Sequence, residues 1–115
     1  MGKGDHLGEF EELVMLAVAI LKDGAYGVAV MDEIKVQTGR NSTISTVHET
    51  LIRLEKKGFL KSYTGGATNV RGGRKKRYFE ITAYGKKALK ATRETREQMW
   101  QQVPKLIWQG GGNER

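Results

Sequence analysis

The side chains with the clearest chemical potential are five basic residues close together in the second half of the chain. They are Arg71, Arg74, Lys75, Lys76 and Arg77. Guanidinium and ammonium groups bind phosphate oxygens through charge-assisted hydrogen bonds. Two glycines lie among them, and a segment of alternating character, typical of a strand, follows directly. The composition predicts a flexible basic tip on a β-hairpin and a polyanion as its partner.

The net charge of the chain is concentrated in the same region. Of 115 residues, 20 are Lys or Arg and 13 are Asp or Glu, which gives a formal net charge of +7. Residues 1–63 contain 8 basic and 9 acidic residues, whereas residues 64–115 contain 12 and 4. This asymmetry favours nucleic acid as the partner, with an anionic membrane second. A basic surface that is merely solvated is the alternative to both.

The other reactive residue types do not form a catalytic or metal-binding pattern. The sequence has no cysteine and only two histidines, so a transition-metal site is not expected. His48-Glu49 begins like a zinc-protease motif, but Ile52 stands where a second histidine is needed. Gly72-Gly73 runs into Arg74-Lys75 without the spacing of a phosphate-binding P-loop. We therefore expect neither an enzyme nor a bound cofactor.

The sequence also predicts where the protein resides. The first residues lack the apolar core of a secretory signal, and the longest apolar run, Leu13 to Leu21, is too short to span a bilayer. The absence of cysteine fits a reducing compartment. We expect a cytoplasmic protein without a membrane partner.

The basic tip must be positioned by the elements around it, and three helices are predicted before it. Apolar spacing and turn residues place them at residues 8–21, 26–38 and 41–58. Gly39 is a suitable C-terminal cap for the second helix. In the third helix, one apolar stripe recurs at helical spacing: Ile44, Val47, Leu51 and Leu54. Its other face is polar, with Ser45, Thr46, His48, Glu49 and Arg53.

Two strands and a last helix follow. Residues 59–64 and 77–82 alternate as strands do, and residues 65–76 would form the hairpin tip between them. Thr82 can cap a helix from Ala83, which Pro104 would kink or end. This helix is too polar to pack fully on its own chain, so its apolar residues are expected to pack on a second subunit. The expected interface residues are Leu89, Met99, Trp100, Val103 and Leu106.

The order of elements predicts a fold class that is mainly α with a small β-hairpin, a winged helix-turn-helix with a C-terminal dimerisation helix. We divide the chain into a DNA-binding domain at 1–82, a dimerisation helix at 83–108 and a disordered tail at 109–115. In this fold the third helix enters the major groove and the basic wing contacts phosphates or the minor groove. The third-helix residues expected at the DNA are Thr43, Ser45, Thr46, His48 and Arg53. The five basic wing residues would add their contacts.

The sequence resembles the PadR family of bacterial winged-helix transcriptional regulators. The segments with this resemblance are Leu7–Val14 (LGEFEELV), Ala25–Val28 (AYGV), Ile44–Leu60 (ISTVHETLIRLEKKGFL) and Gly73–Thr82 (GRKKRYFEIT), followed by Gly85. The resemblance implies a homodimeric repressor that pairs through its last helix, sometimes with its first. It also implies double-stranded DNA with a pseudo-palindromic operator as the partner, and in some members a small-molecule effector that relieves repression.

Two positions depart from the family pattern. Thr46-Val47-His48 matches the Thr-Leu-Tyr signature of the recognition helix except at His48, where the family usually has tyrosine. If the imidazole contacts phosphate instead, operator affinity should weaken as the pH rises from about 6 to 8, because the imidazole loses its positive charge around the reference pKa of histidine. The tryptophan that flanks a drug-binding pore in multidrug-sensing members falls about one turn earlier, where this chain has Arg96. Interface packing is therefore the role expected for Trp100 and Trp108.

Two other functions are compatible with the same residues. A winged-helix protein that binds RNA, or that bends DNA architecturally, would have the same basic wing but no preference for a palindromic duplex. A protein-interaction module would use the winged helix for a protein partner, and its charge would serve only solubility. The resemblance to a family of regulators favours sequence-specific DNA binding over both.

Overall fold

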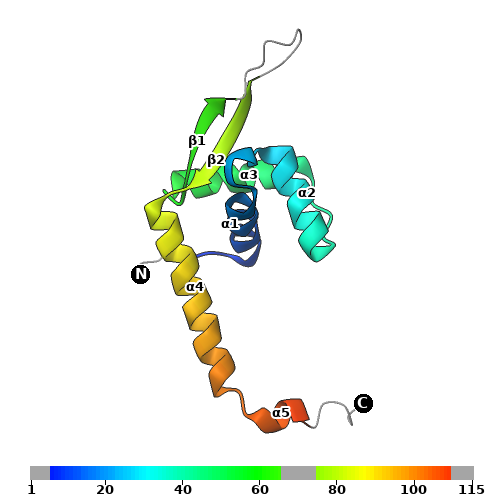
Figure 1. Cartoon of the computed structure of the whole chain (residues 1–115), viewed down its shortest axis with the longest axis vertical. Coiled ribbons are helices and arrows are strands. Elements are labelled where there is room, and N and C mark those ends of the chain that lie inside the picture. Colours follow the sequence, from blue (N-terminus) through cyan, green and yellow to red (C-terminus); the bar gives the residue numbers. More distant parts are fainter. Residues whose placement is uncertain (1–5, 66–74, 110–115) are drawn as a thin grey trace.

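The computed structural model describes residues 6–65 and 75–109 (Figure 1). Three helices come first: α1 (Glu9–Leu21), α2 (Gly27–Thr38) and α3 (Ile44–Lys56), with a short 3-10 turn, η2 (Lys22–Gly24), after α1. Strands β1 (Leu60–Gly65) and β2 (Lys76–Ile81) then form an antiparallel hairpin, followed by α4 (Ala83–Gln102) and α5 (Lys105–Gln109). The predicted fold class, mainly α with a small β-hairpin in a winged arrangement, is confirmed.

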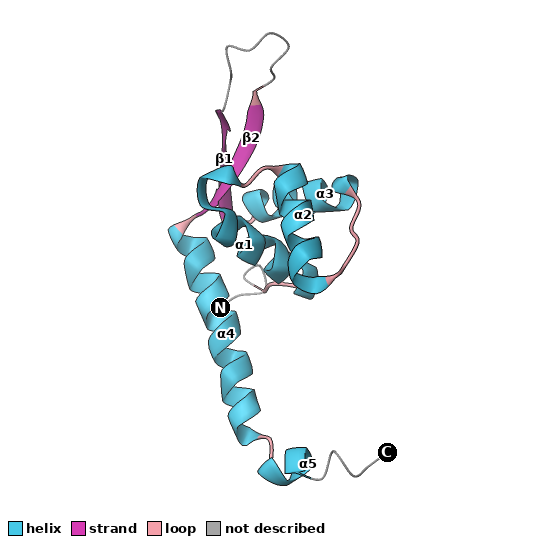
Figure 2. Cartoon of the chain, turned by 45° about the vertical axis from the view of Figure 1, so that its right-hand side comes forward, coloured by secondary structure: helices cyan, strands magenta, loops and turns pink. Residues whose placement is uncertain are grey.

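The core lies between α1, α2, α3 and the base of the hairpin (Figure 2). The apolar stripe of α3 packs inward, because residues three and four apart share one face of a helix. Phe59 and Phe79, at the start of β1 and on the inner side of β2, close the core from the side of the hairpin. The largest fully buried side chains are Met15, Ile34, Leu51, Leu54, Phe59, Leu60 and Phe79.

One residue of the predicted α3 stripe is placed differently. Ile44 is 42% exposed, whereas Val47, Leu51 and Leu54 of the same stripe are fully buried. It is the first residue of α3, and its side chain lies beside Gly27 at the start of α2. Thr50 is buried instead, and its hydroxyl donates to the backbone oxygen of Thr46 at 2.8 Å. This bond satisfies a polar group that would be costly to bury unpaired.

Local signals set the helix ends. The backbone N–H of Thr46 donates to the hydroxyl of Thr43, and that of Gly85 donates to the hydroxyl of Thr82, so both threonines are N-caps. Gly39 ends α2 in the left-handed conformation, with φ of 75°. Gly85 is required for a different reason: a Cβ atom there would lie 2.1 Å from the backbone oxygen of Phe59. The first turn of α4 can therefore lie directly against the start of β1.

Helix α4 leaves the body of the protein and points away from the hairpin (Figure 1). The Cα radius of gyration is 17.6 Å, and the extents are 61 × 34 × 21 Å. A compact chain of this length would have a radius of gyration of about 13 Å. The helix predicted over 83–108 ends at Gln102, because Pro104 has no N–H to continue it, and the chain resumes as α5. Among the described residues, no helix is long and apolar enough to cross a membrane.

Candidate nucleic-acid interface

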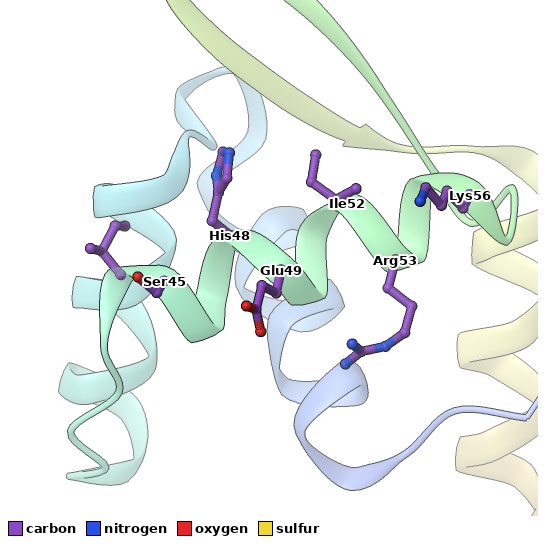
Figure 3. A pocket seen from close by; sticks show the side chains of 7 residues that line it. Ser45, His48, Glu49, Ile52, Arg53 and Lys56 are labelled. Atoms are coloured by element: carbon purple, nitrogen blue, oxygen red, sulfur yellow. The ribbon is translucent and has the colours of Figure 1, made fainter.

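The outward face of α3 is a polar surface with an open groove. Val47, Leu51 and Leu54 are fully buried, so the opposite side of this helix faces solvent. Ser45, Glu49, Ile52 and Lys56 follow each other at spacings of 4, 3 and 4 residues, which places them in one stripe on that side. The groove has a volume of about 780 Å³ and is lined by this stripe together with Ile44, His48 and Arg53 (Figure 3).

The structure places three of the five α3 residues predicted at the DNA along this groove. Ser45, His48 and Arg53 line it, whereas Thr43 and Thr46 lie at the start of the helix. The hydroxyl of Thr43 donates to that of Thr46 at 2.9 Å, so these two side chains are exposed but paired with each other. His48 and Ile52 point to the same side of α3, while Arg53 points the other way, toward α1 (Figure 3).

Arg53 belongs to an ion network at the start of α1. Its Nε donates to the Glu11 carboxylate at 3.0 Å, and the Nζ of Lys57 approaches the same carboxylate at 2.9 Å. The backbone N–H of Gly8 also donates to Glu11, at 2.8 Å. Burial raises the pKa of Glu11, but the hydrogen bonds from Gly8, Lys57 and Arg53 outweigh it, so the pKa lies below its ordinary value. Arg53 and Lys57 thus hold the C-terminal part of α3 against α1 through the two oxygens of the Glu11 carboxylate.

The base of the wing is fastened to the recognition helix. Arg77 of β2 donates from Nη2 to Glu55 of α3 at 2.6 Å and from Nε to the hydroxyl of Ser62 at 3.1 Å. Ser62 in turn donates to the other oxygen of Glu55 at 2.7 Å. The guanidinium predicted to contact DNA therefore links β2, β1 and α3. These charge-assisted contacts fix the angle between the hairpin and α3.

A second wing cation is held by an aromatic cluster. The Nζ of Lys76 lies 4.1 Å from the centre of the Tyr26 ring, close enough for a cation–π interaction. Tyr26 meets Tyr78 edge to face, and Tyr78 stacks on its cross-strand neighbour Tyr63, each pair with ring centres 5.7 Å apart. Lys75 is exposed and forms no salt bridge within the described part of the chain. The predicted contacts Arg71 and Arg74 lie outside the described residues.

Four of the seven groove residues were absent from the predicted site: Ile44, Glu49, Ile52 and Lys56. Ile52 and Lys56 line the groove, although sequence reasoning gave them no role at the DNA. The spacing of the outward stripe could have identified both, since it places them with Ser45. Lys56 adds a positive charge close to the wing end of α3, and Ile52 adds apolar surface at the middle of the groove.

The far end of the molecule has an uncovered apolar surface. Met99, Trp100 and Leu106 are 63%, 62% and 73% exposed, and Val103 is half-buried. Leu89, the fifth residue predicted at the interface, packs against the core of its own chain. Between these two regions, Arg96 of α4 pairs with Glu12 of α1 at 3.0 Å. Helix α1 is thus tied to α3 through Glu11 and to α4 through Glu12.

A hollow of about 350 Å³ lies in this apolar surface. It is lined by Arg96, Met99, Trp100, Val103 and Trp108. The two indole rings stack with their centres 5.3 Å apart, which joins the end of α4 to α5. Trp108 therefore returns to the α4 side chains despite the break at Pro104.

Comparisons with known proteins agree with this arrangement. The model of the transcriptional regulator PadR-like family matches residues 15–91, from within α1 to within α4. A transcriptional regulator from Clostridium thermocellum is 28% identical, with a TM-score of 0.63 over 80% of this chain and 84% of its own. A PadR family regulator from Eggerthella lenta is 26% identical, with a TM-score of 0.64 over 86% of each chain. A protein from Streptococcus mutans, smu.1704, is 25% identical, with a TM-score of 0.63 over 91% of this chain and 93% of its own.

No curated protein matches the sequence. The family match covers well over half of the chain, and it includes all of α2, α3 and the hairpin. The groove along α3, the wing fastened to that helix and the α4 arm are all placed as a winged-helix regulator requires. This chain belongs to the PadR-like family of transcriptional regulators.

Proposed function

We propose that this protein is a sequence-specific DNA-binding repressor whose helix α3 lies in the major groove. The observation that supports this most directly is the outward stripe of α3, in which Ser45, Glu49 and Lys56 are exposed and Ile52 is partly buried. An α-helix with its side chains is about 10–12 Å across, close to the width of the major groove. The outward side chains are small or polar enough for base edges to approach them.

The two parts of the interface have different roles. Ser45, Thr46 and His48 lie on the first half of α3, where recognition helices contact bases and nearby phosphates. Lys75, with Arg71 and Arg74 beyond it, provides charge that binds the backbone irrespective of sequence. Lys76 and Arg77 act by orienting the wing, because their side chains are already engaged within the protein.

The functional unit is a homodimer joined through α4 and α5. The exposed apolar side chains there form a surface that a soluble monomer would not normally leave uncovered. Leu16 and Ile20 of α1, one turn apart and half-exposed, lie on the helix face that begins with Glu12 and add a second apolar surface. A two-fold dimer presents two α3 helices, and it therefore binds a pseudo-palindromic operator.

A small apolar effector would act at the same end of the molecule. The hollow beside the stacked Trp100 and Trp108 offers two aromatic surfaces and the guanidinium of Arg96. A planar aromatic molecule that binds there would change the packing of the dimerisation helices and so the distance between the two α3 helices. Repression would be relieved if the altered spacing no longer matched the half-sites.

Footprinting on the DNA upstream of the protein's own gene tests the geometry of this proposal. We expect two protected half-sites whose centres are about 10 base pairs, or a multiple of one helical turn, apart. Protection of one half-site only would contradict the dimeric operator. Uniform protection without a pattern would favour an architectural or RNA-binding protein, and no protection at all would favour a protein-interaction module.

A further inference from the structure

Glu49 lies in the middle of the outward face of α3. It is exposed, and it is the acidic side chain among the seven that line the groove. Ser45 precedes it by four residues and Ile52 follows it by three, so it shares their stripe opposite the buried side of the helix. A helix that enters the major groove by this face brings the carboxylate to the base edges, between two rows of phosphates.

The cation that would normally neutralise Glu49 is paired with another carboxylate. Arg53 is one turn further along the helix, at the spacing that favours an ion pair. Its Nε instead donates to the carboxylate of Glu11 at 3.0 Å, on the side of α3 that faces α1 (Figure 3). Within residues 6–65 and 75–109, no salt bridge involves Glu49. The carboxylate of Glu49 therefore has no ion-pair partner among the described residues before DNA binds.

Such a carboxylate is tolerated in the major groove only where the DNA offers it a donor. The base edges there present two kinds of donor, the N4 amino group of cytosine and the N6 amino group of adenine. Adenine presents its N7 acceptor beside the amino group, which repels a carboxylate and suits an amide. Cytosine presents the amino group without such an acceptor on the same base, and Glu accepts from it.

We propose that Glu49 is a specificity-determining residue that selects a cytosine in each half-site of the operator. The inference rests on the proposed DNA-binding function and names one base that the protein reads. It has a second consequence, because the same carboxylate lowers affinity for every sequence that lacks the cytosine. Phosphates repel the Glu49 carboxylate in every duplex, and only a sequence with the cytosine offsets this repulsion with a hydrogen bond.

Selection from a random DNA pool tests the inference, with the wild-type protein, Glu49→Gln and Glu49→Ala in parallel. We expect wild-type sites to share a cytosine at one position of each half-site. Glu49→Gln should shift that position toward adenine, since an amide pairs with the N6 and N7 edge, and Glu49→Ala should show no preference there. Replacing the cytosine should lower wild-type affinity about tenfold or more and leave Glu49→Ala unchanged. Affinity for a scrambled duplex should rise severalfold in both variants.

Glu94→Gln is the matched control, because Glu94 is exposed on α4, away from the α3 groove. It removes one negative charge without touching that groove, so it should select the wild-type sequence. Identical selected sequences from the wild-type protein and both Glu49 variants would overturn the role of Glu49 and leave DNA recognition intact. A wild-type pool without any enriched sequence would overturn the proposed function, and this inference with it.

Discussion

Arg53 of the recognition helix donates to Glu11 of α1 at 3.0 Å, so its guanidinium is directed toward the protein body. Lys57 meets the same carboxylate at 2.9 Å. An arginine on a recognition helix would ordinarily be assigned to phosphate or guanine. Here its guanidinium is paired with Glu11, and Glu49 and Ile52 lie at the middle of the groove. Arg53 therefore links α3 to α1 while it also lines the groove.

Removal of the Glu11 charge should destabilise the protein measurably. The Glu11 side chain is only 9% exposed, and Glu11→Gln removes the carboxylate with which Lys57 and Arg53 pair. We expect the free energy of unfolding in urea to fall by about 1–3 kcal/mol. Glu9→Gln is the control in the same helical turn, since the pair of Glu9 with Arg40 is exposed on both sides. That change should cost no more than about 0.5 kcal/mol. Equal losses of unfolding free energy in the two variants would show that the Glu11 network stabilises the fold no more than an exposed ion pair does.

The same network predicts a pH dependence. Because the folded protein holds the pKa of Glu11 below its ordinary value of 4.5, the carboxylate form stabilises the fold. This contribution is fully present above the unfolded pKa and is lost as the pH falls through the folded pKa. The stability difference between the wild-type protein and Glu11→Gln should therefore be constant near neutrality and shrink below about pH 4.5. Urea unfolding of both proteins from pH 7 to pH 3 measures it, and a constant difference throughout would contradict the assignment.

Two neighbouring cations of the wing, Lys75 and Arg77, should respond differently to neutralisation. Lys75→Gln should reduce the slope of log affinity against log salt by about 0.9, as expected for one lost phosphate contact. Arg77→Gln should leave this slope unchanged, because its guanidinium is held by Glu55 and Ser62. It should instead lower stability by about 0.5–1 kcal/mol, since the pair is partly exposed. Anisotropy titrations between 50 and about 200 mM salt distinguish them. A reduced slope for Arg77→Gln would show that it contacts DNA.

A charge on the apolar end of the molecule should separate the proposed dimer. Leu106→Glu places a carboxylate in the apolar surface formed by α4 and α5, where its burial would be costly. At micromolar concentration this variant should sediment as a monomer, whereas the wild-type protein should sediment as a dimer. Val36→Glu is the matched control, because Val36 is 79% exposed on α2, away from that surface. It should remain dimeric. A wild-type protein that sediments as a monomer would contradict the proposed assembly directly.

The sequence predicted the fold well because its signals are local. Thr82, Gly39 and Pro104 act on the backbone within one turn, so the helix ends that they mark could be placed from the residue types alone. The burial of Val47, Leu51 and Leu54 follows from their spacing in the same way. Thr50 could not be assigned to the core, because its burial depends on a bond to Thr46 that residue type does not reveal.

The site was harder to predict because it depends on long-range pairing. Arg53 and Glu11 are 42 residues apart, and Arg77 and Glu55 are 22 apart. A run of basic residues shows that positive charge is present, but not which cations are already neutralised by distant carboxylates. The predicted DNA contacts at Thr43, Ser45, Thr46, His48 and Arg53 remain predictions, as do those of the wing.

Binding to the DNA upstream of the protein's own gene, compared with a scrambled duplex of equal length across a salt series, tests the central claim most directly. We predict a preference of about a thousandfold or more for the upstream sequence, within the range of specific regulators. The preference should persist as salt weakens both affinities. Equal binding to the two duplexes with the same salt slope, and no enriched sequence in a random pool, would contradict sequence-specific regulation and leave the basic wing as a general contact for polyanions.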